Sequence, residues 1–387
     1  MTGVTIGDVP TVALPAWGRS VGFVSPQTHI FDTPLITQSG AVLPPPWQIA
    51  YETYGQLNSD RSNAILLCHA LSGDAHAAGR HSPSDLKSGW SEPFIGPGRA
   101  FDTEQYFVIC MNIIGGCGGS TGPASLDPAT GRPWGSRFPI LTVGDFVAAQ
   151  VRLLDVLGIE QLLAVAGGSL GGMQALEWAA SWGRRVRGVI ALASTARSSA
   201  MTLALNATGR LAITSDPHWC GGDYYAGPPP AAGLATARRI GHISYLSAEA
   251  LEEKFDRRWQ ESTGPQWSHA AEFAVESYLE HQGRSFVNRF DANSYLVITR
   301  AMDYFDLSAR PGGWKAAFSN TSARFFVASW NTDWLYPPAE SEQIVAAAQM
   351  AGRQVHYYPF ASARGHDAFL LEDEQITPPL SHWLASL

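Results

Sequence analysis

Short apolar runs recur along the chain, and most of them are continuous rather than alternating. They span residues 47–57, 64–70, 105–114, 162–166, 186–194, 323–330 and 355–360. A strand covered by helices on both faces is apolar at every position, as in a parallel sheet. Segments with helical periodicity separate several of these runs, and Val143, Val147 and Val151 fall on one side of such a segment. The alternation predicts an α/β fold with a mostly parallel central sheet flanked by helices.

The pattern changes after residue 194, where helix-like segments dominate. They span residues 201–214, 234–246, 248–259, 270–281 and 293–305. No comparable strand pattern interrupts them, and strand patterning resumes at Ala323. We therefore expect a core domain made of residues 1–194 and 307–387. Residues 195–306 would form a helical lid inserted between late strands of the same sheet.

Composition narrows the classes of function. The 387 residues are 45% apolar and 16% charged, as in a globular protein. The net charge is −8 and no basic block occurs, which argues against nucleic acid and anionic membranes as partners. Four cysteines without a C-x-x-C pair argue against a disulfide framework and indicate a cytoplasmic protein. Residues 1–17 contain Pro10 and Pro15 and no early basic residue, so no signal peptide is expected. No apolar run reaches the roughly 18 residues that a membrane-spanning helix needs, so no membrane span is expected either.

A G-x-S-x-G motif provides the strongest chemical signal. Gly167, Ser169 and Gly171 follow an apolar strand and precede a helical segment. In that context the serine occupies a strained turn that exposes its Oγ, and side chains at the two glycines would collide with neighbouring backbone. We expect Ser169 to be a nucleophile. The amide of Leu170, at the helix N-terminus, would donate to a developing oxyanion.

A serine nucleophile requires a base, and the base requires an orienting carboxylate. In this architecture the acid and the histidine follow the serine in that order, each after a late strand. Asp333 follows the run 323–330, and His366 follows the run 355–360. His69 and His242 lie elsewhere in the order, so the pattern predicts a triad of Ser169, Asp333 and His366.

The loop after an early strand should supply the second oxyanion donor. The run that begins at Ala64 leads into this loop, and the Leu71 amide is the natural candidate. His69, Asp74, His76 and His81 also lie there, but their spacing matches no metal-ligand helix. We expect no metal site.

With these features the chain resembles the homoserine O-acetyltransferase family of the α/β-hydrolase superfamily, from about Val24 to the C-terminus. The stretches that carry the resemblance are Tyr51–Asn58, His69–Asp74, Ile95–Gly98, Gly115–Pro123, Asp127–Pro133, Gly168–Trp178, Asp333–Pro338 and Gly365–Leu370. The resemblance implies acetyl transfer from acetyl-CoA to the hydroxyl of L-homoserine in methionine biosynthesis. It also implies a ping-pong mechanism through an acyl-serine, no permanently bound cofactor, and a homodimer whose lid helices meet.

The resemblance assigns further residues to the site. Arg238 and Asp367 match the acceptor-binding positions of the family, and Tyr245 is a weaker match. Homoserine is a zwitterion, so a guanidinium for its carboxylate and a carboxylate for its ammonium suit it chemically.

Several alternatives stay open at this level. Succinyl-transferring members resemble this pattern with an arginine where this chain has Leu335, which offers no partner for a succinyl carboxylate and favours acetyl. Leu170 and Ser72 depart from residues frequent in acetyltransferases, which leaves a succinyl donor and a serine acceptor open. The same triad would serve a carboxylester hydrolase. A ligand sensor on this fold would normally lack a triad member.

Overall fold

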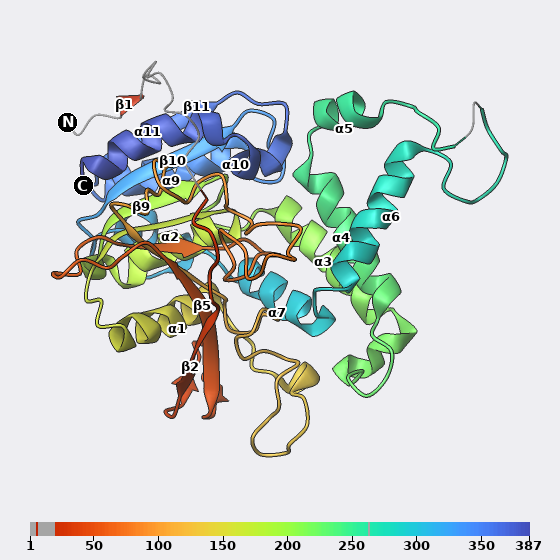
Figure 1. The fold of residues 1–387 in the computed structure, drawn as a ribbon, viewed down its shortest axis with the longest axis horizontal. Helices are drawn as coiled ribbons and strands as arrows, with labels where there is room; N and C mark the ends of the chain where they lie inside the picture. The colour runs from red at the N-terminus through yellow and green to blue at the C-terminus, as the bar shows by residue number, and fades with distance from the viewer. Residues whose placement is uncertain (1–4, 7–19, 262–263) are drawn as a thin grey trace.

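The chain, described here from a computed structural model, is built on one nine-stranded sheet (Figure 1). The structure describes residues 5–6, 20–261 and 264–387, so most of residues 1–17 lies outside it. The strand order is β1-β11-β10-β9-β8-β6-β7-β5-β2. These strands are β1 Thr5–Ile6, β2 Gln27–Phe31, β5 Trp47–Tyr54, β6 Ala64–Cys68, β7 Phe107–Met111, β8 Leu162–Gly168, β9 Val186–Leu192, β10 Arg324–Trp330 and β11 Val355–Phe360.

All strand pairs from β1 to β7 are parallel, and the edge formed by β7, β5 and β2 is antiparallel. The predicted α/β fold with a mostly parallel sheet is therefore confirmed. The apolar pattern did not indicate β2, because this edge strand is mostly exposed and contains polar residues. A short hairpin of β3 Leu35–Ile36 and β4 Val42–Leu43 lies outside the sheet.

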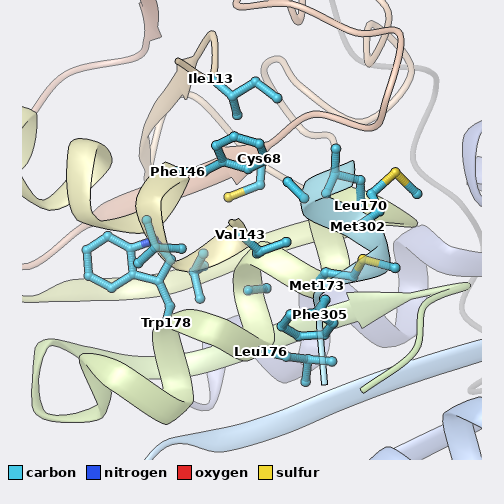
Figure 2. Close-up of a cluster of buried hydrophobic side chains, with 14 of the residues drawn as sticks. Cys68, Ile113, Val143, Phe146, Leu170, Met173, Leu176, Trp178, Met302 and Phe305 are labelled. Atoms are coloured by element: carbon cyan, nitrogen blue, oxygen red, sulfur yellow. The ribbon is translucent and has the colours of Figure 1, made fainter. Parts of the chain in front are cut away.

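Two hydrophobic clusters cover the two faces of the sheet. Alternate residues of β6 belong to different clusters: Leu66 and Cys68 to one, Ile65 and Leu67 to the other. Side chains of α1 (Val143–Val156), α2 (Leu170–Ser181) and α9 (Pro338–Met350) pack in the first cluster, and Figure 2 shows those of α1 and α2 in contact there. The second receives α11 (Asp373–Ala385). Burial on both faces explains why the central strands are apolar at every position.

The segment between β9 and β10 contains the helices that the sequence pattern predicted, with shifted ends. They are α3 Ala200–Thr214, α4 Ala231–Tyr245, α5 Ala248–Phe255, α6 Ala274–Val287 and α7 Ala292–Asp303. Helices α3 to α6 stand to one side of the sheet (Figure 1), where α4 packs between α3 and α6 and also contacts the turn at Gly365–Asp367. This segment therefore lies against the carboxyl end of β11.

The remaining helical elements are short. They are α8 Gly313–Ala317 and α10 Ala368–Leu371, with 3₁₀ turns at Gly135–Arg137, Gly183–Arg185, Pro217–Gly222, Leu307–Ala309 and Gly365–Asp367. None of the helices in the described ranges is both long enough and apolar enough to cross a membrane.

Candidate active site

Ser169 occupies the turn between β8 and α2, with φ 57° and ψ −124°. A positive φ is unfavourable for a residue with a Cβ, and such strain persists only where the surrounding structure enforces it. A Cβ on Gly167 would lie 2.4 Å from the Gly171 carbonyl carbon, and a Cβ on Gly171 would lie 2.1 Å from the Cys68 carbonyl oxygen. The glycines of the motif thus allow three stretches of backbone to meet beneath the serine.

His366 and Asp333, which lie on turns after β11 and β10, are joined by a hydrogen bond. The distance between His366 Nδ1 and Asp333 Oδ2 is 2.7 Å, and both side chains are buried. The other carboxylate oxygen of Asp333 accepts hydrogen bonds from the amides of Leu335, at 3.0 Å, and Tyr336, at 2.9 Å. Because an ionised carboxylate only accepts, Nδ1 carries the proton and Nε2 is left able to receive one.

Burial and charge act in opposite directions on His366. Burial lowers the pKa of this imidazole, but the charge of Asp333 and the hydrogen bond to it raise the pKa, and the net direction is upward from the usual value. A base with a raised pKa takes up a proton more readily at neutral pH.

A narrow cavity of about 30 Å³ lies at Ser169. Tyr245 and Tyr336 line this cavity together with Ser169. Their ring centroids lie 6.0 and 5.2 Å from that of His366. Within the described part of the chain, no hydrogen bond joins Ser169 Oγ to His366, a separation that is common before substrate binds.

Of the two predicted oxyanion donors, Leu170 directly follows Ser169 and Leu71 lines the cavity. Leu170 is the first residue of α2, so its amide has no acceptor inside the helix. Leu71 lines the same cavity as Ser169. The two residues therefore come from different segments that meet near Ser169, and their role as oxyanion donors stays a prediction.

Arg238 and Asp367 both lie close enough to Tyr245 for their charges to act on it, and the charge of Arg238 also acts on Asp367. The Arg238 guanidinium lies 5.7 Å from the Tyr245 ring centroid, and its Nη1 donates to Ser72 Oγ at 3.2 Å. Its buried Nε has no hydrogen-bond partner among the described residues. Burial raises the pKa of the Asp367 carboxyl, and the charges of His366 and Arg238 oppose that shift. Burial likewise raises the pKa of Tyr245.

The sequence analysis missed several residues at this site. Arg289, after α6, donates from Nη1 to the Ser72 carbonyl oxygen at 2.8 Å. Burial, followed by the charge of Arg238, lowers the pKa of Arg289. Thr202 and Asn206 line the cavity from α3. Their spacing of four places them on one helix face, but the sequence could not show which face met the serine.

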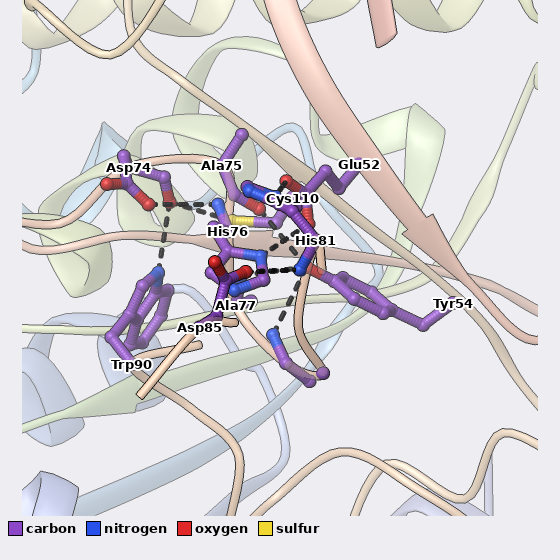
Figure 3. Close-up of polar contacts among 12 residues, drawn as sticks. Glu52, Tyr54, Asp74, Ala75, His76, Ala77, His81, Asp85, Trp90 and Cys110 are labelled. Atoms are coloured by element: carbon purple, nitrogen blue, oxygen red, sulfur yellow. Dashed lines mark hydrogen bonds and ion pairs between the residues drawn. The ribbon is translucent and has the colours of Figure 1, made fainter. Parts of the chain in front are cut away.

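A second polar cluster involves some of the histidines considered above (Figure 3). Glu52, His76 and His81 place one potential ligand atom each within 4.8 Å of one another, and they are the residues in the described ranges that could share a metal ion. The contacts are hydrogen bonds: the two imidazoles lie 3.0 and 2.7 Å from the carboxylate, and Tyr54 donates to it at 2.8 Å. These bonds compensate a buried carboxylate. His69 does not belong to this cluster, because its ring bonds to backbone.

Comparisons with known proteins agree with this geometry. A family model described as the alpha/beta hydrolase fold matches residues 63–373. Homoserine O-acetyltransferase of Methanosphaerula palustris is 52% identical over 365 residues, which are 94% of this chain and 74% of that protein. Homoserine O-succinyltransferase of Acidithiobacillus ferrooxidans is 49% identical over 375 residues, which are 96% of this chain and 97% of that protein.

Solved structures give the same fold with two activities. Homoserine O-acetyltransferase from Bacillus anthracis superposes with a TM-score of 0.87 at 30% identity, covering 94% of this chain and 98% of that one. Esterase E22 also reaches a TM-score of 0.87, at 26% identity, covering 94% of this chain and 100% of that one. Backbone similarity therefore does not separate acyl transfer from ester hydrolysis.

Proposed function

The chain belongs to the homoserine O-acetyltransferase family of the α/β-hydrolase superfamily, and on that premise we propose that it transfers acetyl from acetyl-CoA to L-homoserine through Ser169. The observation that carries this proposal is the pairing of His366 with Asp333, together with a cavity lined by Ser169 and by the two tyrosines whose rings pack near His366. A strained serine and a histidine base whose pKa is raised are the two groups that acyl transfer requires.

The first half-reaction forms an acyl-enzyme. His366 Nε2 takes the proton of Ser169 Oγ as the oxygen attacks the thioester carbonyl. The amides of Leu71 and Leu170 stabilise the oxyanion of the tetrahedral intermediate. Asp333 stabilises the imidazolium, and collapse of the intermediate expels CoA, whose sulfur receives the proton from His366. Acetyl-CoA is thus a co-substrate, and no permanently bound cofactor takes part.

The second half-reaction uses the same groups in reverse. Homoserine enters with its carboxylate toward Arg238 and its ammonium toward Asp367, beside Tyr245. His366 removes the proton of the homoserine hydroxyl, which attacks the acyl-serine ester. The bond between the acetyl carbon and Ser169 Oγ then breaks, His366 returns the proton to Ser169 Oγ, and O-acetylhomoserine leaves. The unpaired Nε of Arg238 supports this role, because a buried guanidinium nitrogen without an acceptor can bind an incoming carboxylate.

Water competes with homoserine for the acyl-enzyme, so the site must restrict its entry. The proposed lid, residues 195–306 over a core of residues 1–194 and 307–387, would do this. Helices α3, α4 and α7 contribute Asn206, Gly241 and Tyr295 to the cavity wall, which supports the assignment.

The identity of the acyl donor is the most detailed part of the proposal. Overall similarity does not decide it, since a succinyl-transferring relative is almost as similar to this chain as the acetyl-transferring ones. Leu335 lies in the cavity wall beside Ser169. An apolar side chain there leaves a succinyl carboxylate without a partner, which favours an acetyl donor.

The remaining expectations concern the cellular setting. We propose a cytoplasmic homodimer in which the lid helices of two copies meet and which has neither nucleic acid nor membrane as partner. All four cysteines are free, in keeping with a reducing compartment. Exposed apolar residues on α3, including Met201 and Leu211, provide a surface for such contact.

The proposal is tested by trapping the acyl-enzyme. Incubation with acetyl-CoA alone should add one acetyl group to the peptide that contains Ser169, detected by mass spectrometry, and homoserine should remove it. Ser169→Ala should abolish both the adduct and turnover; normal turnover by this variant would refute the assignment.

Steady-state rates with acetyl-CoA and succinyl-CoA, each with homoserine or serine, should be highest for acetyl-CoA and homoserine. The structural similarity to esterase E22 makes ester hydrolysis the second candidate. Loss of acetyl-CoA at the same rate with and without homoserine would favour hydrolysis.

A further inference from the structure

A chain of buried amide groups connects the nucleophile helix to the loop that carries Leu71. Trp178 Nε1 donates to Gln150 Oε1 at 2.9 Å, and Gln150 Nε2 donates to Gln174 Oε1 at 2.7 Å. Gln174 Nε2 then donates to the main-chain oxygen of His69 at 3.1 Å and to that of Leu170 at 3.4 Å. Gln174 is fully buried, so these bonds do not compete with water. One side-chain amide thus contacts both backbone segments that carry the proposed oxyanion donors.

The ring of His69 makes a second tie to the same loop. The Ile113 amide donates to His69 Nε2 at 3.2 Å, so the proton of the neutral ring resides on Nδ1. Nδ1 therefore donates to the Ala70 carbonyl oxygen, at 2.8 Å. Burial lowers the pKa of His69, which keeps this ring neutral and this tautomer in place.

These bonds determine where the Leu71 amide points. The Ala70 oxygen also accepts from the Gly73 amide at 3.0 Å, so two donors hold one face of the Ala70–Leu71 peptide. In a trans peptide the carbonyl and the following N–H point in opposite directions. The Leu71 N–H is therefore turned away from His69. A Cβ on Gly73 would lie 2.8 Å from His69 Cβ, so the turn closes tightly around the ring.

We infer that Gln174 and His69 are positioning residues that fix the direction of the Leu71 amide and its distance from the Leu170 amide. This inference rests on the proposed function, since it assigns both amides to the oxyanion. Gln174 ties the loop to α2, and His69 orients the peptide within the loop. Neither side chain touches the reacting atoms, and both act through backbone.

The test compares Gln174→Met with the matched control Gln150→Met. Each variant removes one link of the same buried chain and keeps the side-chain volume, but only Gln174→Met releases the His69 carbonyl. Loss of a single oxyanion donor costs roughly 10²–10³-fold in kcat. We expect misdirection by Gln174→Met to lower kcat about tenfold or more, with KM for homoserine within about twofold of wild type. Gln150→Met should keep kcat within about threefold.

A trifluoromethyl ketone that forms a tetrahedral adduct with Ser169 gives a second readout. Its affinity should fall in parallel with kcat for Gln174→Met and stay near wild type for Gln150→Met. Equal kcat losses in the two variants, or an unchanged adduct affinity with Gln174→Met, would overturn the inference.

His69 provides an independent pair of variants, should Gln174→Met fail to fold. The amide nitrogen of an asparagine can occupy the place of Nδ1 and donate to Ala70, whereas leucine cannot. His69→Asn should therefore retain clearly more kcat than His69→Leu, and equal activities would contradict the positioning role. Failure of the proposed function itself would look different, because wild-type protein would then form no acyl-Ser169.

Discussion

Replacement of Asp333 by asparagine provides the sharpest test of the proposed triad. The Leu335 and Tyr336 amides both donate to Asp333 Oδ1. In Asp333→Asn these two donors hold the asparagine carbonyl oxygen, because the alternative rotamer would place an NH₂ group against two N–H groups. The NH₂ group must then face His366 Nδ1 and donate to it. Since Nδ1 becomes an acceptor, the proton of the neutral ring moves to Nε2, which can no longer take the Ser169 proton.

The expected loss follows from this wrong tautomer. Enforcing it on a catalytic histidine costs about 10⁴-fold in kcat, or about 5 kcal/mol of transition-state stabilisation. The pH dependence should change as well. In the wild type, burial alone lowers the pKa of His366 and the charge of Asp333 raises it above the usual value. The base must be neutral to act. Wild-type activity should therefore decrease as the pH is lowered through this raised pKa. Removing the charge leaves burial dominant, and the acid limb should move to lower pH.

The assay is rapid mixing with acetyl-CoA in the absence of homoserine, with released CoA detected by a thiol reagent across pH. Thermal unfolding verifies that Asp333→Asn is folded. Asp367→Asn is the comparison, because it removes a carboxylate one residue from His366 without changing the Nδ1 bond. It should keep the burst of CoA and mainly raise KM for homoserine. A burst rate for Asp333→Asn within tenfold of wild type, or an unmoved acid limb, would refute the tautomer argument.

Three further variants test other parts of the site. Arg238→Met should lower kcat/KM for homoserine at least about thirtyfold, since about 2 kcal/mol or more is lost when a buried charge pair loses one partner; an intact CoA burst confirms that acylation is spared. Leu335→Arg should raise the ratio of succinyl-CoA to acetyl-CoA turnover about tenfold or more, and an unchanged ratio would remove Leu335 from donor selection. Gly171→Ala should destabilise the fold by more than about 3 kcal/mol in urea unfolding, because its Cβ would meet the Cys68 carbonyl oxygen at 2.1 Å; near-normal stability would show that this turn can relax.

The elements of the core were predictable because burial on both faces leaves a direct mark on the sequence. The continuous apolar runs correspond to β5 through β11, and helical periodicity located α1 and the helices after β9. The apolar pattern did not predict the edge strand β2, because its side chains are mostly exposed. Helix ends also shifted: the predicted segment 248–259 ends at Phe255, since periodicity indicates a face and capping decides the end.

The nucleophile could be located from sequence because its requirements are local. A strand, a turn with glycines at Gly167 and Gly171 and a following helix form one short motif around Ser169, which can be recognised without knowing the rest of the fold. The order of the turns after the last strands likewise singled out Asp333 and His366. Their roles as a set stay predictions that the trapping and tautomer experiments decide.

Other features depended on which segments the tertiary structure brings together. The Gln150–Gln174–His69 chain and the approach of Arg289 to Ser72 join residues that lie far apart in sequence. These contacts exist because β6 pairs with β8, which places the loop after β6 beside α2, and because the chain after α6 returns to that loop. The sequence alone therefore determined the fold class and the reactive serine, through burial and local sterics. The tertiary structure decided which distant polar groups surround that serine. Strand order and helix packing bring these residues into contact, and no periodic pattern in the sequence indicates such contacts.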